Sequence, residues 1–537
     1  MSAASFGPLG RARSTGALLL GLSLVVAGGI RLATFQIPLE RDEGEYAYGG
    51  WLLLRGEGPY RSFFTLKLPG TAAMYAASMA LFGESIAGIR LGFLLVNLAT
   101  TVLLFLFARR LLGGRGAVAT AGAFASLSLS PALLGTFAHA THYVLLPALA
   151  GLLVLQHALE GNGRTRLFAL GGFLLGASVL MKQAGGVFPL FALAWLLSDS
   201  RRRPGRWRET GAFCLGVAAP LALTAAALAL DGTLASAWFW TFTYAREYAS
   251  ATGLAAGLVN LRARLVDLVP QTAGVLLFAA GGLVLAARPG SPPSHRALLV
   301  SFLAFSLLGV CPGLYFRSHY FILALPAVCL LAGAALDWLL EAAARHGPAA
   351  KAGVLALFTL AVAQPIASIG GLLLKSSPEQ VSRALYGRNP FPEAQVIGRY
   401  LREHTGPHAR IAVLGSEPEI LFYSQRRSAT RHIYMYNLVE LQPFAQTMQE
   451  QLIREVEDAH PAYLVYVRTR ASWLTQPGAS PRIFQWADDY LRRDYEKVGQ
   501  VEAPDPDHTR YLWDAEAAAA SADTFTQLQL FRRRSAR

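Results

Sequence analysis

Long apolar runs fill the first 375 residues, and they constrain the fold more than any other feature of the sequence. Many of them reach the roughly 20 residues that a helix needs to cross a bilayer. Only 15% of the residues are charged, whereas soluble domains carry about 25%. Because backbone groups in lipid must be satisfied internally, helices are the expected spanning elements. The sequence therefore predicts a polytopic α-helical membrane protein.

About eleven transmembrane helices are predicted, and a soluble segment follows them. The spans lie near residues 16–35, 85–108, 116–134, 141–159, 166–181, 184–198, 210–230, 269–287, 297–312, 319–340 and 352–374. In the soluble segment, β-like runs at 411–414, 433–436, 463–467 and 526–531 alternate with helical stretches such as 393–404 and 444–459. Such alternation is typical of a small α/β domain with a partly parallel sheet. We therefore expect a transmembrane catalytic domain over 1–375 and a C-terminal soluble α/β domain over 376–537.

The basic residues predict the orientation. The net charge is +14. The sequence has no arginine stripe interleaved with aromatic residues, so this charge does not indicate nucleic-acid binding. Much of it lies in short loops on one side of the predicted spans. These residues are Arg11, Arg13, Arg109, Arg110, Arg115, Arg164, Arg166, Arg201, Arg202, Arg203, Arg206, Arg208, Arg288, Arg296, Arg345 and Lys351. Cytoplasmic loops carry such an excess. We expect a multi-pass protein of the plasma (inner) membrane, with a cytoplasmic N-terminus and an extracytoplasmic C-terminal domain.

The first outer loop is acidic. Asp42 and Glu43 lie among four acids in six residues, at 40–45, directly after the first span. Carboxylates at this position can supply a general base or metal ligands, although a solvated acidic turn remains an alternative. Lys67 follows in the same loop, ahead of an apolar stretch at 70–83 that is too short to span. That stretch fits a helix at the interface, which would hold Lys67 near the headgroups.

Further polar residues gather at the outer ends of later spans. His139 and His142 are three positions apart, which favours one helical face and a metal or phosphate site, or simply a capped helix end. Lys182 separates the fifth and sixth spans, where it either snorkels or meets a lipid phosphate. Arg317, followed by His319, opens the tenth span. Ionisable residues at membrane depth are candidates for function.

An aromatic stretch at 238–244 precedes Arg246 in the outer loop 231–268. It fits an interfacial belt, or a part of the site. The three cysteines, Cys214, Cys311 and Cys329, all lie in apolar runs and offer no zinc cluster. We predict no metal site, since nothing in the sequence demands a divalent cation, although one is compatible with the acids.

Taken together, four motifs resemble the GT-C family of membrane glycosyltransferases over residues 15–345. They are Asp42-Glu43, Lys67-Leu68-Pro69, Lys182-Gln183 and Arg317-Ser318-His319-Tyr320 leading to Pro326. The group includes protein O-mannosyltransferases, lipid A aminoarabinose transferases and bacterial transferases that add sugars to lipopolysaccharide core. Two positions depart from the family pattern. Leu68 replaces a common proline, and His142 stands where relatives often have an acid.

The resemblance implies a polyprenyl-phosphate sugar donor and transfer to a hydroxyl of an envelope acceptor (protein, lipid or glycan) on the outer face. Asp42, or Glu43 beside it, would be the catalytic acid of the first outer loop. The candidates for binding the donor phosphate are Lys67, Lys182, Arg246 and Arg317, and those for other substrate contacts are Tyr46, Tyr60, His139, His142, His319 and Tyr320. Fixed cations at low dielectric would stabilise the leaving phosphate.

Three other functions fit parts of the pattern. Ligases and polymerases of lipid-linked glycans share the topology. A lipid or sugar transporter also has many spans, but repeated halves or broken midplane helices are expected there, whereas here the polar residues gather at one surface. A non-catalytic envelope scaffold would use the C-terminal domain to bind a partner. Asp42→Asn separates these functions, because it abolishes sugar transfer but not scaffolding.

Overall fold

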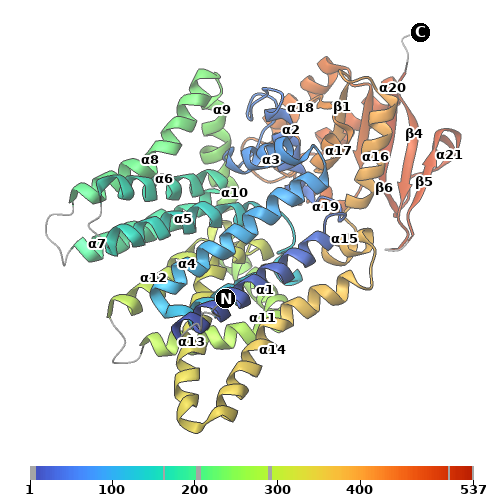
Figure 1. Ribbon diagram of the computed structural model, residues 1–537. Coiled ribbons are helices and arrows are strands. Elements are labelled where there is room, and N and C mark those ends of the chain that lie inside the picture. The colour runs from blue at the N-terminus through green and yellow to red at the C-terminus, as the bar shows by residue number, and fades with distance from the viewer. Residues whose placement is uncertain (1–7, 161–163, 201–206, 288–292, 506–507, 535–537) are drawn as a thin grey trace, which may run out of the picture. The chain divides into compact units, whose positions relative to one another are not determined.

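The computed structural model describes residues 8–160, 164–200, 207–287, 293–505 and 508–534 (Figure 1). The loop residues Arg201, Arg202, Arg203, Arg206 and Arg288 lie outside the described residues. The chain forms two compact units, and both are discontinuous in sequence. The first contains Met1–Phe35, Lys67–Thr71 and Arg90–Leu374, and the second contains Gln36–Leu66, Ala72–Ile89 and Lys375–Arg537.

The first unit is helical. Its main helices are α1 (Pro8–Ala33), α4 (Ile86–Leu127), α5 (Ala140–Glu160), α6 (Thr165–Met181), α7 (Val187–Ser200), α8 (Trp207–Leu230), α11 (Leu254–Ala287), α12 (Pro293–Leu308), α13 (Leu325–Ala343) and α14 (Pro348–Leu373). In the described parts of the chain, seven helices are long and apolar enough to cross a membrane. Leucines such as Leu215, Leu230 and Leu277 are exposed on them. Exposure of this kind suits lipid rather than water, and the fold is that of a multi-pass membrane protein.

The predicted spans coincide with helical segments of this unit. The second and third, at 85–108 and 116–134, are both contained in α4, which leaves helical geometry at Gly113 (φ 79°). The fifth, sixth and ninth fall on the shorter apolar helices α6, α7 and α12. The third span was predicted to reach residue 134, but helix α4 ends at Leu127. A turn and the short 3-10 helix η1 (Pro131–Leu133) follow it.

The outer segment 231–268, expected to be a loop, is mostly helical. It contains α9 (Leu234–Trp238), the π-helical segment η3 (Phe239–Tyr244), α10 (Ala245–Ser250) and the first turns of α11. Arg262, Arg264 and Asp267 lie on these turns of α11, and their charges mask the continuation of the apolar helix. The outer connection therefore contains helices that the sequence did not predict.

Close helix packing between α6 and α8 depends on glycine. A Cβ atom at Gly172 would lie 2.2 Å from the carbonyl oxygen of Phe213, and one at Gly176 would lie 2.3 Å from that of Val217. Small residues allow such backbone approach between membrane helices, where packing rather than hydrophobic burial drives association. The contact fixes the direction of α6, whose C-terminal end carries Lys182.

The second unit contains α2 (Arg41–Leu53), most of α3 (Gly70–Phe82) and the C-terminal α/β fold. Its six-stranded sheet has the order β2-β1-β3-β6-β4-β5. The strands are β1 (Arg410–Leu414), β2 (Arg427–Ser428), β3 (Tyr463–Val467), β4 (Tyr495–Glu502), β5 (Arg510–Trp513) and β6 (Thr526–Arg533). The first three run parallel, and β6, β4 and β5 continue the sheet in antiparallel pairs. The helices are α15 (Pro378–Tyr386), α16 (Phe391–His404), α17 (Pro418–Ser424), α18 (Ala445–Ala459), α19 (Arg470–Trp473), α20 (Arg482–Asp494) and α21 (Asp514–Ala519).

The prediction of a C-terminal α/β domain with a partly parallel sheet is confirmed. Its individual strands were predicted only in part. The run at 433–436 is not a strand. The N–H groups of His432 and Met435 donate to the Oγ1 atom of Thr430 and the Oγ atom of Ser416, at 3.1 and 2.9 Å, instead of to a neighbouring strand. The polar strand β4 and the short strand β5 were not predicted. The domain boundary at 375 stays a prediction.

Candidate functional site

Asp42 lies in the first turn of α2. The residue before that helix, Glu40, accepts a hydrogen bond from the N–H of Glu43 at 2.9 Å, and the carboxylate of Glu43 accepts one from the N–H of Glu40 at 3.3 Å. This is a capping box. It gives the fully buried Glu43 a structural role and leaves Asp42 as the half-buried acid of the pair.

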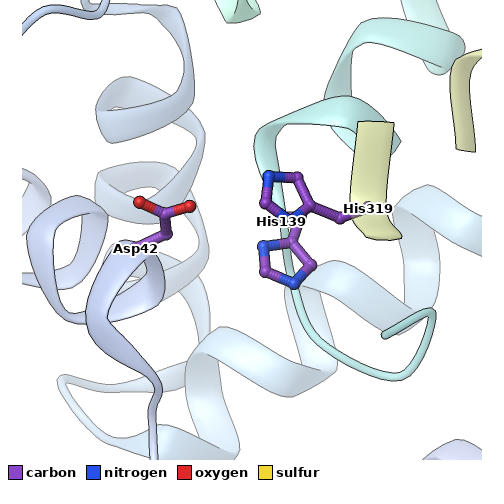
Figure 2. A group of neighbouring side chains, drawn as sticks. All are labelled: Asp42, His139 and His319. Atoms are coloured by element: carbon purple, nitrogen blue, oxygen red, sulfur yellow. The ribbon is translucent and has the colours of Figure 1, made fainter. Parts of the chain in front are cut away.

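The Asp42 carboxylate has a fixed partner. Its Oδ1 atom accepts a hydrogen bond of 2.9 Å from the hydroxyl of Tyr434. Figure 2 shows this carboxylate beside the first turn of α2. A carboxylate is stabilised at a helix N-terminus by the helix dipole. Burial, and then the neighbouring Asp42 and Glu43 charges, raise the pKa of Glu40 well above its usual range.

Arg41 connects α2 to the end of strand β1. Its Nη2 atom lies 2.7 Å from Glu417 and 3.0 Å from the side-chain oxygen of Asn389, and its Nε atom donates to the carbonyl oxygen of Ser416. Glu417 also accepts a hydrogen bond of 2.5 Å from Ser472. The end of a strand in an α/β fold, a common ligand-binding position, is therefore occupied here by a side chain of the same unit.

Tyr46 and Tyr60 are both buried in this unit. The Tyr46 ring packs against that of Tyr75 on α3, with centroids 5.5 Å apart. Tyr60 adopts a left-handed conformation (φ 67°), and its N–H donates to the carbonyl oxygen of Phe63 at 2.7 Å. Burial, supplemented by the Glu45 charge, raises the pKa of Tyr60. Both tyrosines therefore shape the loop around α2.

In the first unit, Lys182 lies between α6 and the short 3-10 helix η2 (Gln183–Gly186), in an extended conformation that ends α6. Its Nζ atom lies 3.8 Å from the centroid of the Tyr320 ring. Tyr320 belongs to the 3-10 segment η5 (Ser318–Ala324), which precedes α13. A cation over an aromatic face is attracted by the ring quadrupole, so this contact holds the Lys182 ammonium group beside η5.

The segment that carries Lys67 packs against the same end of α6. The Thr71 hydroxyl donates to the carbonyl oxygen of Met181 at 2.7 Å. A Cβ atom at Gly70 would lie only 2.5 Å from the carbonyl oxygen of Leu180. The structure thus brings the Lys67–Thr71 segment to the residue directly before Lys182, although the two lysines are far apart in sequence.

Three predicted imidazoles are also placed in this unit. The rings of His139 and His319 stack, with centroids 4.1 Å apart and an interplanar angle of 14°, as Figure 2 shows. His319 meets Tyr320 edge to face at 4.9 Å. His142 instead packs against Phe93 on α4 at 4.9 Å. His139 precedes α5, so the two predicted neighbours do not share one helical face.

Arg317 is the residue before η5, and its Nη2 atom lies 3.4 Å from the Tyr248 hydroxyl. Tyr248 on α10 stacks on Tyr315 at 4.9 Å. Arg246 on the same helix is 80% exposed and pairs with Glu247 at 3.4 Å. The structure therefore groups Lys182, Arg317 and the stacked imidazoles around Tyr320 and its neighbours, whereas the Arg246 side chain is largely exposed and pairs with Glu247.

Sequence reasoning missed two sets of residues. Arg31 and Arg90 are buried cations in the helical unit, and Arg31 donates to the Asn97 side chain at 3.1 Å and to the Ser128 carbonyl oxygen at 2.8 Å. The charge of Arg31 at the end of an apolar run was a usable signal. Tyr434 is the other residue that was missed. No local sequence pattern indicates that it contacts Asp42.

These arrangements define a multi-pass membrane protein with a cation- and histidine-bearing cluster in the helical unit and a capped acid in the other. The family model of dolichyl-phosphate-mannose-protein mannosyltransferases matches residues 67–230. ArnT from Cupriavidus metallidurans in the apo state shares the fold, with a TM-score of 0.60 and 16% identity over 97% of this chain and 98% of that one. The chain therefore has the GT-C fold that the sequence resemblance predicted.

Two other solved structures are similar. The Archaeoglobus fulgidus oligosaccharyltransferase tethered with an acceptor peptide aligns with a TM-score of 0.54 and 12% identity, over 93% of this chain and 74% of that one. The arabinofuranosyltransferase AftD from Mycobacteria aligns with a TM-score of 0.51 and 18% identity, over 99% of this chain but 40% of that one. No curated protein matches the sequence.

Proposed function

We propose that the protein transfers a sugar from a polyprenyl-phosphate donor to a hydroxyl group of a cell-envelope acceptor. The observation that carries this proposal is the extent of the fold shared with ArnT bound to undecaprenyl phosphate, which covers 94% of this chain and 99% of that chain with a TM-score of 0.59. The mannosyltransferase family model, which matches residues 67–230, supports the same class of donor.

The cations of the helical unit have the chemistry to hold the donor phosphate. Lys182 contacts Tyr320 on η5, and Arg317 directly precedes η5. The Lys67–Thr71 segment is fixed to the end of α6 by Thr71. In a low-dielectric site, fixed cations stabilise charge that develops on a leaving group without reorganisation. These residues would bind the phosphate and stabilise it as the bond to the sugar breaks. Arg246, which is highly exposed, is a weaker candidate.

Asp42 is the proposed general base. Its carboxylate would accept the proton of the acceptor hydroxyl while the acceptor oxygen attacks the anomeric carbon. The bond between that carbon and the phosphate oxygen breaks, and polyprenyl phosphate leaves. Glu43 is the weaker candidate, because its carboxylate closes the capping box with Glu40. A general base of this kind contributes about 10²–10⁴-fold to the rate.

The proposed location is the outer face of the plasma (inner) membrane. The short loops after the second, fourth and tenth predicted spans carry Arg109, Arg164 and Arg345, which favours a cytoplasmic position for them. With eleven spans, the N-terminus is then cytoplasmic and residues 376–537 are extracytoplasmic, where we expect them to recognise the acceptor.

A ligase of lipid-linked glycans is the second candidate. The likeness to the Archaeoglobus fulgidus oligosaccharyltransferase, over 93% of this chain, favours it. Such an enzyme would use the same cations for a lipid diphosphate and the same acid for the acceptor. The two candidates differ in the donor, so the donor is the quantity to vary.

The deciding experiment measures release of polyprenyl phosphate from a panel of polyprenyl-phosphate sugars by the purified, reconstituted protein, with envelope extract as the acceptor. We expect release by the wild type and none by Asp42→Asn. Release only from lipid-diphosphate glycans would favour the ligase. A lack of release from every donor, together with donor movement across vesicles, would overturn the enzyme proposal in favour of transport.

A further inference from the structure

Helix α2, which carries Asp42, packs on the C-terminal α/β fold within the second unit. A Cβ atom at Gly44 would lie 2.6 Å from the backbone nitrogen of Glu419 on α17, so only glycine permits this approach. The N–H of Ser428 donates to the Tyr48 hydroxyl at 2.9 Å, and the N–H of Leu39 donates to the Tyr423 hydroxyl at the same distance. These contacts bind the start and the middle of the helix to residues beyond 410.

Arg41 fixes the rotation of α2 about its axis. The buried Glu417 carboxylate holds one end of its guanidinium at 2.7 Å, while Ser416 accepts from its Nε atom. Ser472 donates to the second oxygen of Glu417 at 2.5 Å. A paired and hydrogen-bonded charge in a buried position is expensive to rearrange. Since Asp42 is the next residue along the helix, its direction is set as well.

Tyr434 acts on the carboxylate itself. Its hydroxyl donates to Oδ1 of Asp42 at 2.9 Å. The segment that carries Tyr434 is held in place because the N–H of Met435 donates to the Ser416 hydroxyl at 2.9 Å. The two side chains that determine the direction of Asp42, Arg41 and Tyr434, are therefore both anchored at the end of strand β1.

We infer that Tyr434 is a positioning residue for the reaction, by which the C-terminal domain orients the Asp42 carboxylate. The hydrogen bond to Oδ1 restricts the side-chain rotation of Asp42 and so fixes the direction in which its carboxylate accepts the proton of the acceptor hydroxyl. The domain then belongs to the catalytic machinery in addition to any role in acceptor recognition. This inference rests on the proposed role of Asp42 as the general base.

Tyr434→Phe in the full-length protein removes the hydroxyl and keeps the ring. A hydrogen bond to a charged group corresponds to about 10–100-fold in rate, so we expect kcat to fall by about that factor. The KM for the polyprenyl-phosphate donor and the unfolding temperature should stay unchanged. Because a hydrogen bond favours the charged form of a carboxylate, the acid limb of the pH–rate profile should move to higher pH.

Tyr436→Phe is the matched control. The Tyr436 hydroxyl lies in the same segment but donates to the backbone carbonyl oxygen of Ala471, at 2.9 Å. We expect this variant to keep the wild-type kcat and pH profile. In the Asp42→Asn background, Tyr434→Phe should cause no further loss, because the carboxylate that it orients is already absent.

The outcomes separate this inference from the proposed function. Lack of transfer by the wild type with every donor removes the proposed function. If the wild type is active and Tyr434→Phe has an unchanged kcat and pH profile, the inference is overturned and the proposed function stands. A fall in kcat that is matched by a fall in unfolding temperature overturns the inference as well. If Tyr434→Phe does not fold, Tyr434→His provides the test, because it keeps a hydrogen-bond donor on a ring. A folded Tyr434→His variant that is inactive, with the acid limb of its pH–rate profile unmoved, overturns the inference.

Discussion

The Nζ atom of Lys182 lies 3.8 Å from the centroid of the Tyr320 ring. This contact joins the end of α6 to η5 and fixes the Lys182 ammonium group over an aromatic ring. A lysine that merely snorkels needs no such partner. The geometry is therefore that of a positioned charge.

Lys182→Met should reduce kcat/KM for the donor by about 10–100-fold, because a charge-assisted hydrogen bond to phosphate is lost while the apolar stem is kept. Steady-state kinetics with varied donor concentration measure the change. Lys351→Met is the control, since Lys351 is exposed on α14 and is not one of the proposed donor-binding residues. Equal effects of the two variants would contradict a specific role for Lys182.

Asp42→Asn and Glu43→Gln should behave differently. We expect the first to lower kcat by about 10²–10⁴-fold with little change in stability. In the second, the glutamine oxygen can still accept from the Glu40 N–H, so the rate should change less than tenfold. Loss of the charged cap at the helix N-terminus should cost about 0.5–1 kcal/mol of stability. Paired kinetics and thermal unfolding separate the two. A larger kinetic loss in Glu43→Gln would reverse the assignment of the base.

Gly70→Ala should release the Lys67–Thr71 segment from α6. The new Cβ atom meets the Leu180 carbonyl oxygen at 2.5 Å, so the segment must shift, and donor binding should weaken by more than tenfold. Gly353→Ala on α14 has open space around it, where alanine usually stabilises a helix by about 1 kcal/mol. Titration with undecaprenyl phosphate, read by intrinsic fluorescence, compares the two variants. Wild-type affinity in Gly70→Ala would show that this segment does not contribute to binding.

Glu419 makes the stability of the α/β fold depend on pH. Burial, and then the Glu417 charge, raise its pKa well above the usual 4.5. The folded state therefore holds a proton that the unfolded state has lost above about pH 4.5, and stability decreases as the pH rises from there through the folded pKa. Glu419→Gln imitates the protonated form. Its unfolding temperature should vary less between pH 5 and 8 than that of the wild type, and a variant as pH-dependent as the wild type would exclude Glu419 as the source.

The membrane fold was predictable because apolarity along a helix is a local property. Eleven runs in the sequence coincide with helical segments, including the two that α4 contains. The first turns of α11 were not predicted, because Arg262, Arg264 and Asp267 interrupt the hydropathy. Strand β4 was missed for a similar reason, since it alternates polar residues around Gly499.

The candidate site was predictable only in part. Lys182 and His319 were found because charge and imidazole are conspicuous beside apolar runs, but their pairing through Tyr320 depends on how α6 and η5 meet. Tyr434 was not found, because it reaches Asp42 across 392 positions of sequence. It lies in a segment whose hydrophobic pattern indicated a strand.

The sequence separation between Arg41 and Glu417, 376 positions, has a consequence for biosynthesis. A ribosome that has just completed α14 has produced every helix of the membrane unit, but has not yet produced β1, α17 or Tyr434. Helix α2 then lacks the surface on which it folds. The Asp42 carboxylate is thus ordered by residues that are synthesised after the last membrane helix.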